Sequence, residues 1–173
     1  FLGARGVKSI DLAVSLRDGA HHSGNWGGLL ANPGIILAHA LATITDARGT
    51  IQVPEWRPPL PETVRVALES IEIESSAHGP AIDPDWGEPG LTPSQRVFGW
   101  NSFEILAFTT GRPDAPVNAI PADARAHCQL RYVVGTDAAE IVPALRHHLD
   151  KAGFPMVEIA NPPRGDLGAS RID

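Results

Sequence analysis

Residues 7–17 (VKSIDLAVSLR) alternate between hydrophobic and polar side chains. The hydrophobic set is Ile10, Leu12, Val14 and Leu16, and the polar set is Ser9, Asp11, Ser15 and Arg17. Because successive side chains of a strand point to opposite faces, this alternation predicts a strand with one buried face. Residues 124–133 alternate in the same way. Their inward set is Ala124, Ala126, Cys128, Leu130 and Tyr132, and their outward set is Arg125, His127, Gln129 and Arg131.

Two segments have helical periodicity instead. Asn32-Pro33 is typical of an N-cap followed by Pro in the first turn, and Arg48-Gly49 is expected to end this helix. Its apolar face consists of Ile36, Leu37, Ala40, Leu41 and Ile44. Ile141, Leu145 and Leu149 predict a second helix that is closed by Gly153, with a capping box at Asp137 and Glu140. Pro143 predicts either a kink or a late helix start there.

Two more strands are expected, at residues 101–110 and 156–160. The predicted fold class is therefore α+β, a ferredoxin-like β-α-β-β-α-β order with a four-stranded antiparallel sheet and two helices on one face. Residues 1–50 are expected to form the first β-α half and 101–160 the second half, followed by residues 161–173 as a tail. Residues 51–100 are rich in Pro and Gly and are expected to be an irregular insertion, with a short helix at 62–74 and loop at 79–100. The four tryptophans either anchor this insertion onto the sheet, which is the favoured expectation, or line a substrate cleft; they are Trp26, Trp56, Trp86 and Trp100.

The amino-acid composition excludes some classes of binding partner. The 173 residues are 43% hydrophobic and 20% charged, with a net charge of −6. This is a globular composition without a basic cluster, so nucleic acid is not an expected partner. There is no apolar run of transmembrane length, so we expect no membrane span. Cys128 is the only cysteine, which excludes an intrachain disulfide and is consistent with a cytoplasmic protein.

The glycine-rich stretch at residues 19–34 (GAHHSGNWGGLLANPG) holds the unusual chemistry. Ser23 lacks the flanking glycines of a nucleophile elbow, and the seven histidines lack metal-ligand spacing. His22, on a flexible loop near a helix start, is suited to donating a hydrogen bond as a neutral imidazole. Arg131 offers a planar fork for a carboxylate. The residues alone therefore define an α+β domain without a complete active site.

The segments D-L-A-V-S-L-R-D-G-A-H-H-S-G-N-W-G-G and N-A-I-P-A-D-A-R-A-H-C-Q-L-R-Y-V resemble the M20 family of dinuclear-zinc peptidases and amidohydrolases. The resemblance covers residues 1–53 and 101–160 and is strongest to the carnosinase and Cys-Gly dipeptidase branch. It implies that this chain is the lid, or dimerisation, domain alone. It also implies that two zinc or other divalent ions belong to a missing catalytic domain, that residues 161–173 return toward that domain, and that this chain carries no metal ligand.

The resemblance also implies roles for particular residues. His22 would reach into the active site of the partner in a homodimer and stabilise the developing oxyanion, while Asn118 and Arg131 would hold the substrate, Arg131 by its terminal carboxylate. Gly24, Gly27 and Gly28 would allow the loop to turn sharply and leave room for the partner. The sequence departs from the family pattern at His21, where an apolar residue is usual, which leaves open which imidazole reaches the site.

The implied activity is hydrolysis of amide bonds in dipeptides or similar small peptides, for which this fragment alone would be inactive. Two alternatives remain open at this point. One is an N-acyl amino acid deacylase of the same family, with an N-acyl amino acid as substrate. The other is a non-catalytic ferredoxin-like module that dimerises through a sheet edge or the first helix, because this fold by itself does not define a chemistry.

Overall fold

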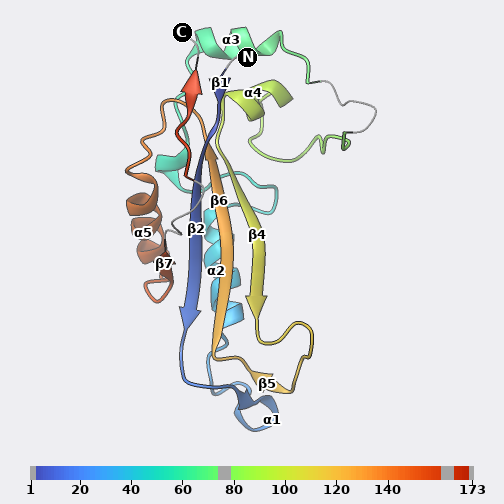
Figure 1. The fold of residues 1–173 in the computed structure, drawn as a ribbon, viewed down its shortest axis with the longest axis vertical. Coiled ribbons are helices and arrows are strands. Elements are labelled where there is room, and N and C mark those ends of the chain that lie inside the picture. The colour runs from blue at the N-terminus through green and yellow to red at the C-terminus, as the bar shows by residue number, and fades with distance from the viewer. Residues whose placement is uncertain (1–2, 74–78, 161–165, 172–173) are drawn as a thin grey trace.

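A four-stranded antiparallel sheet organises the protein. The computed structural model describes residues 3–73, 79–160 and 166–171. The sheet consists of β2 (Gly6–Ser15), β4 (Ser102–Thr110), β6 (Asp123–Tyr132) and β7 (Glu158–Ala160), in the order β4-β6-β2-β7. Helices α2 (Pro33–Ile44) and α5 (Ile141–Lys151) pack on one face (Figure 1). The predicted ferredoxin-like class is confirmed.

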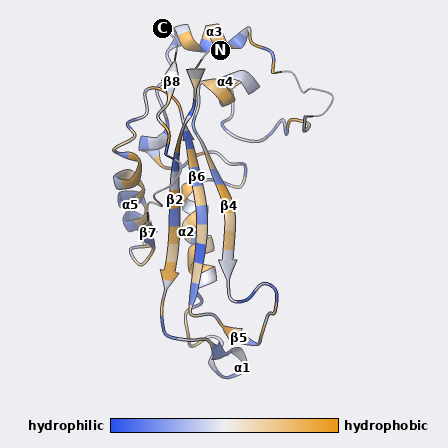
Figure 2. Cartoon of the chain, viewed as in Figure 1, coloured by the Kyte–Doolittle hydropathy of each residue, from blue (hydrophilic) through white to orange (hydrophobic). Residues whose placement is uncertain are grey.

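The two alternating strands are neighbours at the centre of this sheet. β2 and β6 pair over ten consecutive positions, from Gly6↔Tyr132 to Ser15↔Asp123. Every predicted inward residue of β6 is buried, and so are Ile10, Leu12 and Val14 of β2. Figure 2 shows the alternation of hydrophobic and hydrophilic residues along these strands. Asp11, Arg125 and His127 accordingly lie on the face without helices, whereas Ser9, which was also predicted to point outward, is buried and its amide donates to the carboxylate of Asp166.

The predicted start of α2 is confirmed, because the Asn32 side chain accepts hydrogen bonds from the amides of Gly34 and Ile35. The predicted end at Gly49 is wrong, since the helix ends at Ile44. The Asp46 carboxylate accepts hydrogen bonds from the amides of Arg48 and Thr50, and these bonds lower its pKa. This turn competes with further helix, and Gly49 supplies its positive φ of 78°.

Helix α5 differs from its prediction at the start. The expected capping box is wrong, because Glu140 makes no side-chain cap and Asp137 instead accepts from the amide of Ala139. The late start is confirmed, and Pro143 lies in the first turn, where its missing N–H is not needed. Gly153 closes the helix as predicted. With φ 89° it donates to the carbonyl of Asp150, while Phe154 donates to that of Leu149, the Schellman pattern.

Residues 51–100 begin inside the hydrophobic core. Ile51, Val53 and Trp56 are fully buried, and η1 (Pro54–Trp56) is a single 3-10 turn. The Trp56 indole donates to the carbonyl of Ile141 at 2.9 Å, which confirms that this tryptophan is an anchor. Buried Asn101 donates to the carbonyl of Trp56 at 2.7 Å. This stretch is therefore tied to both the helix layer and β4.

Two helices follow, α3 (Glu62–Glu69) and α4 (Pro93–Phe98). The helix predicted at 62–74 is thus confirmed over its first part, and residue 74 lies outside the described residues. The expectation of loop throughout 79–100 is wrong at α4. Thr92 and Gln95 form a capping box there, and buried Ser94 donates to the carbonyl of Leu68 in α3.

Two short ladders extend the ends of the sheet. β1 (Gly3–Ala4) pairs with β8 (Ser170–Arg171) at one end. β3 (His21–His22) pairs with β5 (Ala119–Ile120) at the other (Figure 1). The predicted tail is described only at residues 166–171. Among the described residues, no helix has the length and apolar character to cross a membrane.

Cys128 should resist alkylation while the protein is folded. Burial, and secondarily the charge of Asp11, raises the pKa of Cys128 from 9.0 to about 12. Because the thiolate is the reactive form, iodoacetamide at about pH 8 should modify the denatured chain but not the native one. In the folded state the Cys128 thiol also keeps its proton at pH values where the same thiol in the unfolded chain has lost it. The free energy of unfolding should therefore fall as the pH rises from 9.0 toward about 12.

Mass spectrometry after timed alkylation checks the first expectation, and denaturant titrations across that pH range check the second. A Cys128→Ala variant is the control, since it should lose less stability over the same range. Rapid modification of the native protein would contradict this account of the buried thiol.

Candidate functional site

Two loops that are distant in sequence meet at the end of the sheet away from β1 and β8. We call this region the tip; it consists of β3, α1 (Ser23–Trp26), β5 and the adjoining residues 27–31 and 111–118. His22 pairs with Ala119, and the amide of Ser23 donates to the carbonyl of Asn118 at 2.9 Å. The structure therefore brings two of the predicted site residues, His22 and Asn118, together.

His22 is exposed at the tip and is the N-cap of α1. Its Nδ1 atom accepts a hydrogen bond from the amide of Gly24 at 3.1 Å. A ring nitrogen that accepts a hydrogen bond carries no proton, so the neutral ring has its N–H at Nε2. His22 is thus prepared as a hydrogen-bond donor. The ring of His21, by contrast, lies edge-on to Trp26 with a centroid separation of 6.3 Å.

The predicted loop glycines shape this arrangement in three different ways. A Cβ atom on Gly24 would lie 2.6 Å from Cε1 of His22, and one on Gly27 would lie 2.6 Å from the carbonyl oxygen of Ser23. Gly28 has a φ of 83°, which side chains rarely adopt. The space at Gly24 is therefore occupied by the imidazole of its own chain.

Arg131 lies near the opposite end of β6, on the polar face of the sheet, where it pairs with Val7 and Ser102. It lies eight positions along the strand from Asp123 at the tip end, about 27 Å at the usual rise of a strand. The structure therefore does not bring Arg131 close to His22 and Asn118 of the same chain. Arg5 lies beside it and donates to the Ser102 hydroxyl at 3.2 Å.

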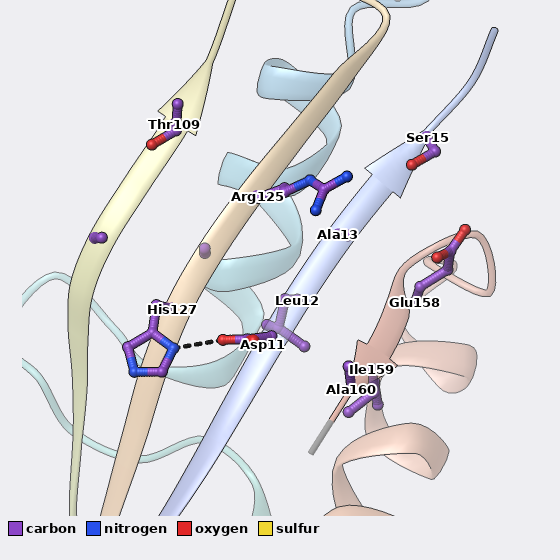
Figure 3. Close-up of a pocket in the computed structure, with 12 residues that line it drawn as sticks. Asp11, Leu12, Ala13, Ser15, Thr109, Arg125, His127, Glu158, Ile159 and Ala160 are labelled. Carbon is purple, nitrogen blue, oxygen red and sulfur yellow. Dashed lines mark hydrogen bonds and ion pairs between the residues drawn. The ribbon is translucent and has the colours of Figure 1, made fainter. Parts of the chain in front are cut away.

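A shallow hollow of about 490 Å³ lies on the polar face between the tip and Arg131. The His127 ring donates to the carboxylate of Asp11 there, with Arg125 and Glu158 at its sides (Figure 3). Sequence reasoning placed Asp11 and His127 on outward faces but did not pair them. No local signal pairs them, because alternation assigns both side chains to outward faces but does not give the register of the two strands. Among the described residues, no three His, Cys, Asp or Glu side chains are placed to hold a metal ion.

The outer edge of β4 is apolar. Within the part of the chain that is described, β4 pairs with β6 alone, and its Ile105, Leu106 and Phe108 are exposed. Ile35 near the start of α2 is also exposed. Free strand edges and contiguous apolar surfaces are typical of association sites. The chain is therefore a two-layer α+β domain with an unpaired edge on its described β4 strand.

The comparison with family models agrees with that class. The model described as "Peptidase dimerisation domain" of the M20 peptidases matches residues 2–156. The chain therefore belongs to the M20 peptidase dimerisation domain family. No curated protein sequence matches the chain significantly.

Solved structures with the same fold include three enzymes of this family. An M20 family metallo-carboxypeptidase from Sulfolobus solfataricus has a TM-score of 0.78 and 21% identity. The alignment includes 99% of this chain and 40% of the carboxypeptidase. Human carnosine dipeptidase 1 has a TM-score of 0.73 and 18% identity, and the dipeptidase Dug1p of Saccharomyces cerevisiae has a TM-score of 0.74 and 19% identity. Each alignment includes 99% of this chain and 38% of the other protein. At these identities the likeness establishes the fold. The chain spans about two fifths of the length of these proteins.

Gly24→Ala should displace the His22 ring with little loss of stability. The new methyl group would overlap the imidazole, which is an exposed side chain and can rotate away. Gly28→Ala is the matched control. A Cβ atom at Gly28 would contact no other atom, but its positive φ is unfavourable for alanine, so this variant should destabilise the tip by about 1 kcal/mol. NMR of the His22 ring nitrogens and thermal unfolding measure the two effects. An unchanged Nδ1 acceptor signal in Gly24→Ala would show that this glycine does not position the ring.

Proposed function

We propose that this chain is the dimerisation domain of a metal-dependent M20 hydrolase that cleaves the amide bond of dipeptides or similar small peptides. His22 acts in the active site of the partner subunit, while Asn118 and Arg131 hold the substrate. The proposal rests on the family assignment and on the position of these three residues in the fold.

The observation that supports it most is the separation of Arg131 from the tip. An extended dipeptide spans about 7 Å, much less than the length of β6 between the tip and Arg131. One copy of the chain therefore cannot use His22 and Arg131 on the same small substrate. A second copy, turned end for end, supplies the missing group at each site. The two sites of such a dimer are equivalent by its twofold symmetry.

The edge of β4 is suited to this dimer. Two antiparallel β4 strands, one from each copy, would continue the sheet and direct the tip of one copy toward the Arg131 end of the other. Ile105, Leu106 and Phe108 would leave water in that contact, together with Ile35 of α2. A bulge between Ile105 and Ala107 breaks the regular ladder with β6, and bulges of this kind increase the local twist of a strand.

The role proposed for each residue follows from the hydrogen-bond donors of its side chain. Hydrolysis of an amide places negative charge on the carbonyl oxygen, and the Nε2–H of His22 would donate to it. The carboxamide of Asn118, beside His22, would contact the same part of the substrate. The fork of Arg131 would pair with the terminal carboxylate. Domain closure would bring these groups onto the substrate.

Metal ions enter the proposal only through the rest of the full-length protein. M20 enzymes typically use metal ions, but the described residues of this chain do not form a metal site. We therefore assign the metals, proposed as two zinc ions, to the catalytic domain. β1 and β8 pair side by side, so both connections to that domain would leave from the same end of the sheet.

A mixing experiment tests the action of His22 in trans. In the full-length protein, His22→Ala should lower kcat about 10²- to 10³-fold, the usual loss of one oxyanion donor. Arg131→Ala should mainly raise KM for substrates with a free carboxylate. When the two variants are dissociated, mixed and reassociated, half of the dimers are heterodimers with one intact site. Under conditions where both variants are nearly inactive, the mixture should regain about a quarter of wild-type activity.

Dipeptides and N-acetyl or N-succinyl amino acids serve as parallel substrates, and the better of the two classes identifies the reaction. Glu69→Ala, an exposed change at the end of α3, is the control that should leave activity unaltered. If the mixture shows no recovery, His22 acts within its own subunit or not at all. Wild-type kinetics in both single variants would show that the residue roles are wrong.

A further inference from the structure

Arg5 is the residue between β1 and β2, at the end of the sheet where the chain ends pair. Its Nη1 donates to the hydroxyl of Ser102 at 3.2 Å, and Ser102 is the cross-strand partner of Arg131. The side chains of Arg5 and Arg131 are both only partly accessible. The guanidinium of Arg5, from the residue before β2, and that of Arg131, from β6, are therefore neighbours around Ser102 on the polar face of the sheet.

Among the described residues, neither guanidinium makes an ion pair with a carboxylate. Burial, and then the charge of Arg131, lowers the pKa of Arg5, while Glu104 acts in the opposite direction. Glu104 is exposed, and among the described residues it makes no ion pair with either arginine. Within the same part of the chain, the guanidinium of Arg131 has no hydrogen-bond partner, and that of Arg5 has the Ser102 hydroxyl. Like charges that are brought together and partly desolvated cost free energy unless an anion joins them.

We propose that Arg5 and Arg131 jointly bind the carboxylate of the substrate, with Arg5 as a specificity-determining residue. This inference rests on the proposed function, in which Arg131 alone takes that role. A guanidinium pair contributes two planar forks, and the Ser102 hydroxyl orients one of them. The site therefore selects substrates with a free terminal carboxylate over their C-terminal amides more strongly than one arginine would.

The test compares a dipeptide with its C-terminal amide in the full-length enzyme. Arg5→Gln should raise KM for the dipeptide about 10-fold or more, the usual effect of losing a charged hydrogen bond. It should leave kcat, and the KM of the amide, nearly unchanged. Arg5→Lys keeps the charge without the fork and should give an intermediate KM. Arg48→Gln, at an exposed turn on another part of the surface, is the matched control and should leave the KM of both substrates unchanged.

The possible outcomes separate this inference from the proposed function. If Arg131→Ala raises KM for the dipeptide and neither Arg5 variant does, the role of Arg5 is overturned and the proposed function stands. If Arg5→Gln affects the dipeptide and the amide equally, Arg5 serves only to connect β1 to β4 through Ser102, and the inference also fails. Thermal unfolding of each variant identifies any that fails to fold, in which case Arg5→Lys decides.

If the wild-type protein hydrolyses neither substrate, the proposed function is overturned, and titration calorimetry with the dipeptide and its amide decides the inference. Carboxylate-dependent binding that is weakened in Arg5→Gln supports it. Equal binding by wild type and variant overturns it.

Discussion

The pairing of β2 with β6 is the contact on which the rest of the molecule depends. Ten consecutive residue pairs join these two central strands. Because side chains alternate along a strand, a shift by one position would move every inward residue of one strand to the water. The register is therefore held by burial of Ile10, Leu12 and Val14 of β2 against the helices, together with the inward residues of β6. The same register sets Asp11 opposite His127 and Val7 opposite Arg131 on the polar face.

In the proposed function, the residues that act on the substrate lie toward the two ends of these strands. At one end the chain leaves β2 and returns before β6, so the loops that carry His22 and Asn118 must meet, and β3 and β5 pair as a result. At the other end β6 places Arg131 beside Ser102 and near Arg5. The sheet keeps these ends apart within one copy, so under the proposed function a small substrate would contact His22 of one copy and Arg131 of the other. The apolar edge of β4 and the separation of the ends thus favour the same arrangement, a symmetric dimer.

The glycine-rich stretch is explained by local contacts more than by flexibility. The amide of Gly24 fixes the protonated nitrogen of His22, and the missing side chain of Gly24 makes room for the ring. Gly27 allows the turn of α1 to approach the carbonyl of Ser23. A histidine that is exposed and yet held by the backbone in one tautomer costs the protein little stability, because no charge or polar group is buried to achieve it.

The sequence by itself determined the features that depend on near neighbours. Alternation identified β2 and β6 and their inward residues, Asn32-Pro33 identified the start of α2, and Gly153 the end of α5. The ends of helices were predicted less well, because a turn or a second cap nearby can compete with the expected one. The Asp46 turn ended α2 before Gly49, Asp137 formed a turn of its own in place of a capping box, and the Thr92 box that begins α4 was missed among prolines and glycines.

The tertiary structure alone decided which distant residues share a place. The pairing of Asp11 with His127, the approach of Asn118 to His22, the burial of Trp56 under α5 and the neighbourhood of Arg5 and Arg131 join segments far apart in the chain. These contacts follow from strand order and register, which are set by the packing of the whole sheet against its helices. A local pattern contains no information on that order, and so it predicts which face a residue occupies but not which residue it meets.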